Sequence, residues 1–287
     1  MLCPFTRILK DALTDKRAVG AFNVGNMEML IGIVKAAEDL RSPIVLQIAE
    51  KRFKHSPLEY VGPMMFSVAQ KAKIEIALEL DHGFTVENIR RSLAFGFNSI
   101  MFDGSDKPVA ENIRLTSAVA KEVHNQGAAL EAEIGVVGGS EGGAMYSASC
   151  ARLEDIIKLG SESECDALAV AIGNAHGHYK GVPKLNFELL QQSHAALPGM
   201  PLVLHGGTGI APEDFRKAIT MGICKINIAT ANFDAFVAGA AAYCQAVAPD
   251  SRSYFGLNES AVEKIYENTC AHIRLFNNTE PLDVINF

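Results

Sequence analysis

The 287-residue chain lacks several features that mark particular classes of protein. It has no long block of Lys and Arg, and its formal net charge is −7 with a pI of about 5.6. These properties disfavour a nucleic-acid or membrane-surface partner. No apolar run approaches the roughly 20 residues that a membrane span needs. The first residues also lack the basic start and apolar core of a signal peptide. We therefore expect a cytoplasmic protein with no nucleic-acid or membrane partner.

The cysteines form no C-x-x-C pair, and no linker rich in Pro, Gly or Ser divides the chain. The six cysteines are Cys3, Cys150, Cys165, Cys224, Cys244 and Cys270. A chain of this length, with 48% hydrophobic residues, does not need disulfides to hold its core. We expect reduced thiols and one domain over residues 1–287.

Short apolar runs alternate with longer amphipathic stretches along the chain. The runs carry Val, Ile or Phe and are too short for helices, so we interpret them as strands. They occupy residues 18–24, 43–49, 74–80, 98–104, 128–135, 166–173, 201–206 and 223–230. This alternation favours an α/β fold, a parallel (β/α)₈ TIM barrel, over the alternative of an open doubly wound sheet. The stretch from about residue 231 is predicted to add C-terminal helices.

In a barrel the active site forms where the C-terminal ends of the strands meet. Three of these ends deliver a histidine that is followed by glycine, namely His82, His176 and His205. Three imidazoles and an open position are typical of a catalytic zinc site, so we expect a metal here. Asp81 directly precedes the first histidine, and His178 is an alternative ligand. The remaining histidines are predicted to be solvated: His55, His124, His194 and His272.

Two glycine-rich stretches near the same rim favour other roles. HGGTGI, residues 205–210, leads into APEDF, which is typical of a helix start, and the backbone N–H groups of such a turn can bind phosphate. The seventh and eighth strands are also where TIM barrels often hold phosphate. GVVGGSEGGAM, residues 135–145, contains Glu141 and is predicted to be a mobile lid or a plain flexible loop.

The motifs at these strand ends resemble, in order, those of the class II, zinc-dependent ketose-bisphosphate aldolases, which include fructose- and tagatose-bisphosphate aldolases. They are ELDHG, GFNSIMFDGS, LEAEIG, LAVAIGNAHGHY, LVLHGGTGI and GICKINIAT, and they cover roughly residues 15 to 232. AFNV and ENIRLT are also similar to the family. The resemblance implies an aldehyde-lyase of carbohydrate metabolism that reversibly cleaves a phosphorylated ketose to dihydroxyacetone phosphate and an aldehyde. A divalent cation would stabilise the enediolate that forms.

The resemblance also implies roles for individual residues. His82, His176 and His205 would bind Zn²⁺, and Asp81 would exchange the hydroxyl proton whose removal starts the cleavage. Glu141 matches the position that moves protons at the nascent enediolate carbon.

Further residues match the surroundings of the metal and the substrate. Asp103 and Glu133 match positions that support the metal ligands or replace one of them. A monovalent cation, Na⁺ or K⁺, near the phosphate and a homodimer or homotetramer are further family features. The pocket for the dihydroxyacetone-phosphate half would be formed by Gly177, Gly206, Gly207, Thr208, Asn227, Ile228, Ala229 and Thr230.

Departures from the family pattern gather on the aldehyde side of the substrate. Ala49 stands where many members place a serine near a second phosphate, and Lys51, Arg52 and Lys54 add positive charge nearby. Arg252, in PDSRSYF, could keep an anion-binding role across a subunit interface. We therefore expect the reaction to be kept while the second product varies. Two kinds of substrate fit this pattern: a bisphosphate, and a ketose phosphate that ends in a carboxylate or a neutral hydroxyl.

Three other functions compete with this interpretation. A Schiff-base aldolase would use Lys225, which shares strand parity with Asn227 but lies deeper in the barrel. A zinc hydrolase would need a further acidic group on the eighth strand, where Asn227 and Thr230 stand. A non-catalytic barrel that binds sugar phosphate would be expected to lack a metal ligand or the acid/base group, whereas Asp81, the three histidines and Glu141 are all present.

Overall fold

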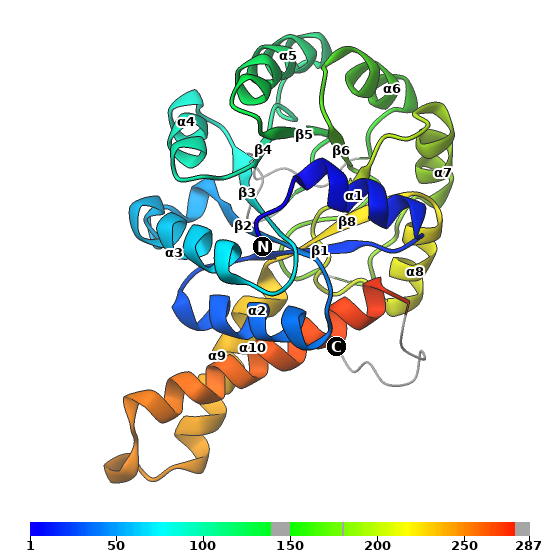
Figure 1. The fold of residues 1–287 in the computed structure, drawn as a ribbon. Coiled ribbons are helices and arrows are strands. Elements are labelled where there is room, and N and C mark those ends of the chain that lie inside the picture. The colour runs from blue at the N-terminus through cyan, green and yellow to red at the C-terminus, as the bar shows by residue number, and fades with distance from the viewer. Residues whose placement is uncertain (139–149, 180, 279–287) are drawn as a thin grey trace.

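The computed structural model describes residues 1–138, 150–179 and 181–278, and its centre is a closed barrel of parallel strands (Figure 1). The strands follow one another around the barrel in chain order, and β8 pairs with β1. They are β1 (Val19–Asn23), β2 (Ile44–Ala49), β3 (Ile76–Gly83), β4 (Ser99–Phe102), β5 (Ala129–Ile134), β6 (Ala167–Val170), β7 (Leu202–Leu204) and β8 (Ile223–Ile228). Each predicted apolar run contains most or all of one strand, so the prediction of a TIM barrel is confirmed.

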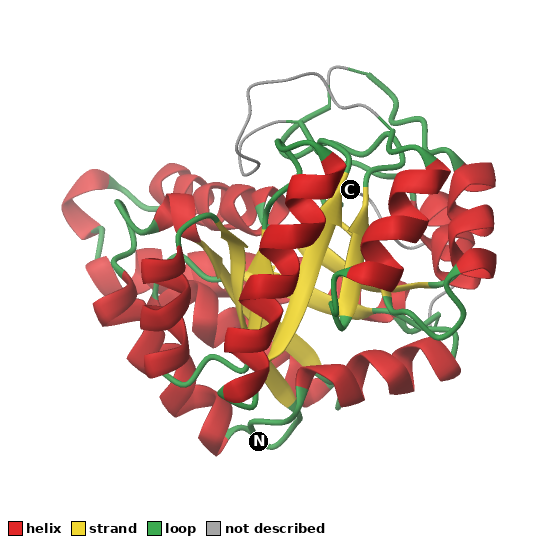
Figure 2. Ribbon diagram, turned by 90° about the horizontal axis from the view of Figure 1, so that it is seen from above, coloured by secondary structure: helices red, strands yellow, loops and turns green. Residues whose placement is uncertain are grey.

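Helices surround the barrel, and the N-terminal helix closes one of its ends (Figures 1 and 2). The longer loops lie at the opposite end. The helices are α1 (Phe5–Thr14), α2 (Met27–Asp39), α3 (Leu58–Lys71), α4 (Val86–Ala94), α5 (Val109–Asn125), α6 (Leu153–Glu162), α7 (Phe187–Ala196), α8 (Pro212–Thr220), α9 (Thr230–Ala246) and α10 (Tyr254–Phe276), with the 3₁₀ turns η1 (Glu50–Arg52) and η2 (Pro249–Ser251).

The two faces of each strand serve different cores because side chains alternate along a strand. In β2, Leu46 belongs to the large apolar cluster between the barrel and its helices. Its neighbour Val45 belongs to a second cluster, which is made of small strand residues such as Ala77 and of Phe5 and Leu9 of α1. The second cluster plugs one end of the barrel, which leaves the other end open for a site.

The last two helices form a hairpin that projects from the barrel (Figure 1). The C-terminal part of α10 returns to the barrel, where His272 is 1% exposed and its Nδ1 donates to the Asn268 carbonyl at 2.8 Å. Burial lowers the pKa of His272 to about 4. The prediction that His272 is solvated was therefore wrong, because this end of the helix packs into the core. Among the described helices, none has the length and apolar character to cross a membrane.

Candidate metal centre and active site

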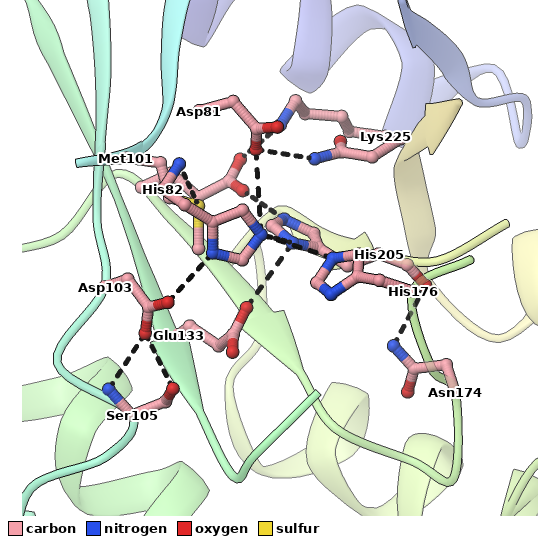
Figure 3. Close-up of polar contacts among 12 residues, drawn as sticks. Asp81, His82, Met101, Asp103, Ser105, Glu133, Asn174, His176, His205 and Lys225 are labelled. Carbon is pink, nitrogen blue, oxygen red and sulfur yellow. Dashed lines mark hydrogen bonds and ion pairs between the residues drawn. The ribbon is translucent and has the colours of Figure 1, made fainter. Parts of the chain in front are cut away.

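Three imidazoles converge at the open end of the barrel (Figure 3). His82 is the second-last residue of β3, His176 follows β6, and His205 directly follows β7. His82 Nε2 lies 3.2 Å from His176 Nε2 and 3.1 Å from His205 Nδ1. All three candidate ligand atoms lie within 4.8 Å of one another, and the rings are buried.

The distances from His82 to the other two ring nitrogens fit one small divalent ion. Zn–N bonds of about 2.0–2.1 Å in a tetrahedral site place ligand nitrogens about 3.3–3.4 Å apart. The observed separations of 3.1 and 3.2 Å from His82 to the other two rings are close to this value. Without a proton or a metal ion between them, the lone pairs of imidazole nitrogens would repel one another at such distances. A shared cation therefore suits the cluster.

A local distortion of β3 allows Asp81 and His82 to meet at the same rim. Adjacent strand residues normally point to opposite faces. The register of β3 against β4 shifts between Leu80 and Gly83, and His82 has a φ of +46°. Such a conformation is uncommon for a residue other than glycine. The bulge turns the His82 ring toward the barrel mouth, where its Nε2 lies 3.9 Å from Asp81 Oδ1.

Carboxylates hold the far nitrogens of two rings. His82 Nδ1 lies 2.9 Å from Asp103 Oδ2, and Asp103 Oδ1 accepts from the backbone and the hydroxyl of Ser105 at 3.1 and 2.6 Å. His205 Nε2 lies 2.9 Å from Glu131 Oε1. These contacts place the N–H of each ring on the side away from the cluster, so the facing nitrogen keeps its lone pair for a metal.

Glu133 faces the cluster from β5 (Figure 3). Its Oε2 lies 3.4 Å from His205 Nδ1, the nitrogen on the ligand side. Both carboxylate oxygens are buried and have no hydrogen-bond partner among the described residues. Burial, and then the charge of Asp103, raise the pKa of Glu133 well above its usual value. A buried carboxylate in this position fits a nearby cation that would offset its charge.

The protonation of the trio follows from burial and charge. At His82, burial lowers the imidazole pKa, but Asp81 and Asp103 outweigh it and raise the pKa to about 10. Burial, and then the positive charge of His82, lower the pKa values of His176 and His205 well below their usual range. The site therefore favours positive charge at its centre, as a proton on His82 or as a metal ion in its place.

Asp81 is gripped by side-chain amides from two other strands. Its Oδ2 accepts from Asn23 Nδ2 at 2.9 Å, and its Oδ1 accepts from Asn227 Nδ2 at 3.3 Å. Gln47 Nε2 donates to Asn23 Oδ1 at 2.7 Å and so fixes which end of that amide faces Asp81. Neither Asn23 nor Gln47 was predicted to have a role. The available signal was that both are polar residues inside apolar strands.

The proposed phosphate residues lie together beside the metal ligands. One small cavity is lined by His176, Gly177, Gly206, Gly207, Thr208, Asn227, Ala229 and Thr230. Gly206 has a φ of +64°, and a Cβ there would lie 2.2 Å from the Ala175 carbonyl oxygen. Two side chains join the loops that form this cavity. Asn174 Nδ2 donates to the His205 carbonyl at 3.0 Å, and the Tyr179 hydroxyl donates to the Gly206 carbonyl at 3.0 Å.

Two details of the predicted phosphate pocket differ in the structure. The side chain of Ile228 packs in the outer apolar core, because it follows the inward-facing Asn227 in the strand. The helix that begins beside the cavity is α9, at Thr230, where Thr208 Oγ1 accepts from the Ala231 N–H at 3.1 Å. The start of α8, around Pro212, lines a separate cavity.

The basic residues on the aldehyde side are spread over two regions. Arg52 lies in η1 and lines a cavity together with Asn23 and Ala49. Its guanidinium carbon Cζ lies 5.3 Å from the centroid of the Phe233 ring. Arg252 directly follows η2 in the connection between α9 and α10, and its Nε donates to the Val247 carbonyl at 3.1 Å. This connection forms the far end of the projecting hairpin (Figure 1). The structure therefore does not bring Arg252 to the rim of its own barrel.

The remaining candidates stand apart from the trio. His178 is exposed and lies 3.2 Å from Asp234 in α9, so it does not join the ligand cluster. Glu141 lies outside the described residues. Lys225 is fully buried between two carboxylates, which outweigh the effect of burial and raise its pKa above its usual value. A lysine held as an ammonium ion is a poor nucleophile, which disfavours the Schiff-base mechanism.

Comparisons with known proteins agree with this geometry. The sequence profile of the class-II fructose-bisphosphate aldolases matches residues 4–280. The fructose-bisphosphate aldolase of Geobacillus stearothermophilus is 38% identical over 242 residues, which cover 82% of this chain and 83% of that protein. The 6-phospho-5-dehydro-2-deoxy-D-gluconate aldolase of Halalkalibacterium halodurans is 36% identical over 232 residues, which cover 80% of each chain.

A solved structure shows the same fold over nearly the whole chain. The crystal structure of the YdjI aldolase from Escherichia coli K12 is similar with a TM-score of 0.86 at 33% sequence identity, and the match covers 96% of this chain and 97% of that one. The chain therefore belongs to the class II fructose-bisphosphate aldolase family, whose members are carbon–carbon lyases.

Proposed function

We propose that the protein catalyses the zinc-dependent, reversible aldol cleavage of a phosphorylated ketose to dihydroxyacetone phosphate and an aldehyde. The observation that carries this proposal is the meeting of three imidazoles and a carboxylate at one rim. His82 Nε2 lies 3.1–3.2 Å from a nitrogen of each other ring and 3.9 Å from Asp81 Oδ1. Family membership supports the same reaction class.

The donor set favours zinc as the resident metal. Three imidazoles that leave one position open are typical of catalytic Zn²⁺. When bound, Zn²⁺ would act as a Lewis acid for the negative charge that develops on the substrate. His82, His176 and His205 would hold it, and Asp103 and Glu131 would orient two of these rings through their far nitrogens.

Asp81 would accept the hydroxyl proton during cleavage and return it during synthesis. Asn23 and Asn227 each donate to one of its oxygens, and each carboxylate oxygen can accept a second hydrogen bond. The carboxylate can therefore receive a proton without first breaking its hydrogen bonds to the two amides. Glu141 would move the proton at the carbon of the triose product.

The cavity between the loops after β6, β7 and β8 would hold the phosphate of the triose half. It is lined by glycines and by the start of α9, where backbone N–H groups and the helix dipole favour an anion. Thr208 would add a hydroxyl. A bound Na⁺ or K⁺ near this phosphate belongs to the same proposal. Binding energy from the phosphate, which does not react, would position the bond to be cleaved.

The aldehyde product is the variable part of the proposal. One relative is named for a bisphosphate and another for 6-phospho-5-dehydro-2-deoxy-D-gluconate. Ala49 offers no hydroxyl at the end of β2, and Arg52 lines the cavity beside it. This composition supports a substrate with an anionic group at that end, either a second phosphate or a carboxylate.

A homodimer or homotetramer is also part of the proposal. Among the described residues of α9, only Asn232 and Gly239 are buried, although most of the helix is apolar. Val237, Tyr254 and Phe255 are exposed on the same hairpin. A helix that is apolar on all sides is normally covered. A second copy of the chain would cover the hairpin and would bring Arg252 to the active site of the neighbouring subunit. The proposal places this oligomeric enzyme in the cytoplasm.

An assay of triose-phosphate release tests the proposal. Fructose 1,6-bisphosphate, tagatose 1,6-bisphosphate, 6-phospho-5-dehydro-2-deoxy-D-gluconate and a ketose 1-phosphate without a second anionic group form the panel. We expect release of dihydroxyacetone phosphate from at least one compound of this panel. Tight binding of these compounds without cleavage would instead support the non-catalytic sugar-phosphate-binding barrel.

A further inference from the structure

A charged cluster lies deeper in the barrel than the active site. Lys225 of β8 is fully buried, and its Nζ lies 2.6 Å from Glu79 Oε2 and 2.8 Å from Glu131 Oε2. Glu79 and Glu131 are themselves fully buried, and the Ser99 hydroxyl donates to Glu79 Oε1 at 2.9 Å. The Phe5 ring of α1 lies below the ammonium group, with its centroid 5.7 Å from Nζ.

Stability alone does not explain this cluster. Burying three ionisable groups costs several kcal/mol for each one that stays charged, and well-packed apolar residues of similar volume are often equally stable or more stable. The layer beneath it is built of small apolar residues such as Ala77 and Ala129, which would also accommodate an apolar layer. The charges therefore indicate a second role, which depends on what they contact.

Glu131 connects the cluster to the metal site. One of its oxygens contacts Lys225 at 2.8 Å, and the other contacts His205 Nε2 at 2.9 Å. The carboxylate is thus held from below by an ammonium group and accepts the His205 N–H above. An imidazole that donates through Nε2 keeps the lone pair on Nδ1, and this nitrogen faces His82.

We propose that Lys225 is a positioning residue that, through Glu131, holds the His205 ring and its tautomer ready for the metal. The proposal rests on the proposed function, because it assigns His205 as a metal ligand. Lys225 bridges two carboxylates that would otherwise repel each other. Without the bridge, Glu131 has no partner below and is pushed away from Glu79, so the hydrogen bond that aims His205 is lost.

The test is a comparison of Lys225→Met with Glu79→Gln. The first variant removes the bridge at similar side-chain length. The second replaces a buried carboxyl group of the same cluster with an amide but leaves the contacts of Lys225 with Glu131 and of Glu131 with His205. We would titrate each protein with Zn²⁺ against a chelator, record side-chain ¹⁵N NMR spectra of the zinc-loaded histidines, and measure Tm without metal.

The proposal predicts that Lys225→Met loses roughly 10- to 100-fold in zinc affinity, as loss of a group that orients a metal ligand typically does. Its spectrum should also lose the signature of an Nε2-protonated His205. Glu79→Gln should keep its zinc affinity within a few-fold of the wild type and should keep the signature of an Nε2-protonated His205, even if its Tm falls. Wild-type zinc affinity and an unchanged histidine spectrum in Lys225→Met, with only a lower Tm, would overturn the proposal and leave Lys225 a structural residue.

Two further controls keep the outcome clear. If Lys225→Met does not fold, the double variant Lys225→Met/Glu79→Gln, which leaves one unpaired carboxylate in place of two, is compared with Glu79→Gln under the same expectation. The wild-type titration is read first. If the wild-type protein fails to bind zinc tightly, the proposed function fails, whereas equal tight binding by all the variants contradicts only the role of Lys225.

Discussion

Asn23 donates its side-chain amide to Oδ2 of Asp81 at 2.9 Å, although the two residues come from different strands. The contact joins the first strand of the barrel to the residue that we propose as acid and base. It is one of two amide contacts that hold this carboxylate, the other coming from Asn227. The position of the carboxylate thus depends on closure of the barrel.

Removing the first amide should therefore reduce turnover. A hydrogen bond to a charged group is worth about 1.5–3 kcal/mol, so we expect Asn23→Ala to lower kcat/KM by roughly 10- to 100-fold. Zinc content should stay near that of the wild type, because Asn23 contacts no metal ligand among the described residues. Steady-state kinetics and metal analysis on the same sample check this. A lost metal ion would show that Asn23 acts by another route.

Gly206 should tolerate no side chain. A Cβ there would lie 2.2 Å from the Ala175 carbonyl oxygen, next to His176. Gly127 is a matched control, because its φ of +74° is similarly positive but a Cβ at that position would meet nothing within 4 Å. We expect Gly127→Ala to destabilise by about 1–2 kcal/mol with normal activity. Gly206→Ala should destabilise more and abolish cleavage. Urea unfolding and the cleavage assay measure both effects, and equal behaviour would contradict the close-packed pocket.

The buried His272 should make stability fall in mild acid. Burial lowers its pKa in the folded protein to about 4, whereas the ordinary histidine pKa, which applies to the unfolded chain, is 6.5. The unfolded chain therefore takes up a proton first as the pH falls. Stability is full above about pH 6.5 and declines down to about pH 4, by about 3 kcal/mol from this group. Chemical unfolding between pH 7 and 4 should show a shallower decline in His272→Gln.

The exposed His55 provides the control for this experiment. His55→Gln should keep the wild-type slope of unfolding free energy against pH. If His272→Gln keeps the same slope as well, the acid sensitivity comes from other groups.

Arg252 should matter for substrate binding only if a second copy brings it to an active site. In a single chain its guanidinium contacts carbonyl groups of the hairpin, including that of Val247. We expect Arg252→Ala to raise KM for substrates with an anionic group at the aldehyde end and to leave KM unchanged for a ketose 1-phosphate without one. Sedimentation should show the same oligomer for both proteins. An equal change in KM for all substrates would argue against this role.

The barrel and the three-histidine cluster were predictable because their signals are local. Short apolar runs of similar length alternate with helical stretches, and each of the three histidines stands at or just beyond a strand end. In a parallel barrel all such ends meet on one side, so His82, His176 and His205 could be assigned to one rim.

Other features depend on contacts between strands, which a single sequence does not show. Alternation would place Asp81 and His82 on opposite faces, and only the bulge beside Gly83 explains why both reach the rim. The polar character of Asn23 and Gln47 was visible, but their partners depend on which strands are neighbours. The outward direction of the Ile228 side chain, by contrast, follows from the sequence alone, because side chains alternate along a strand and Asn227 points inward.

Metal removal tests the central claim most directly. The wild-type protein and His82→Ala would be stripped with a chelator, assayed for release of dihydroxyacetone phosphate from the substrate panel, and assayed again after addition of one equivalent of Zn²⁺. We predict that stripping abolishes release, that zinc restores it in the wild-type protein, and that His82→Ala stays inactive. Undiminished release by a protein shown to be free of metal, or by His82→Ala, would contradict the account.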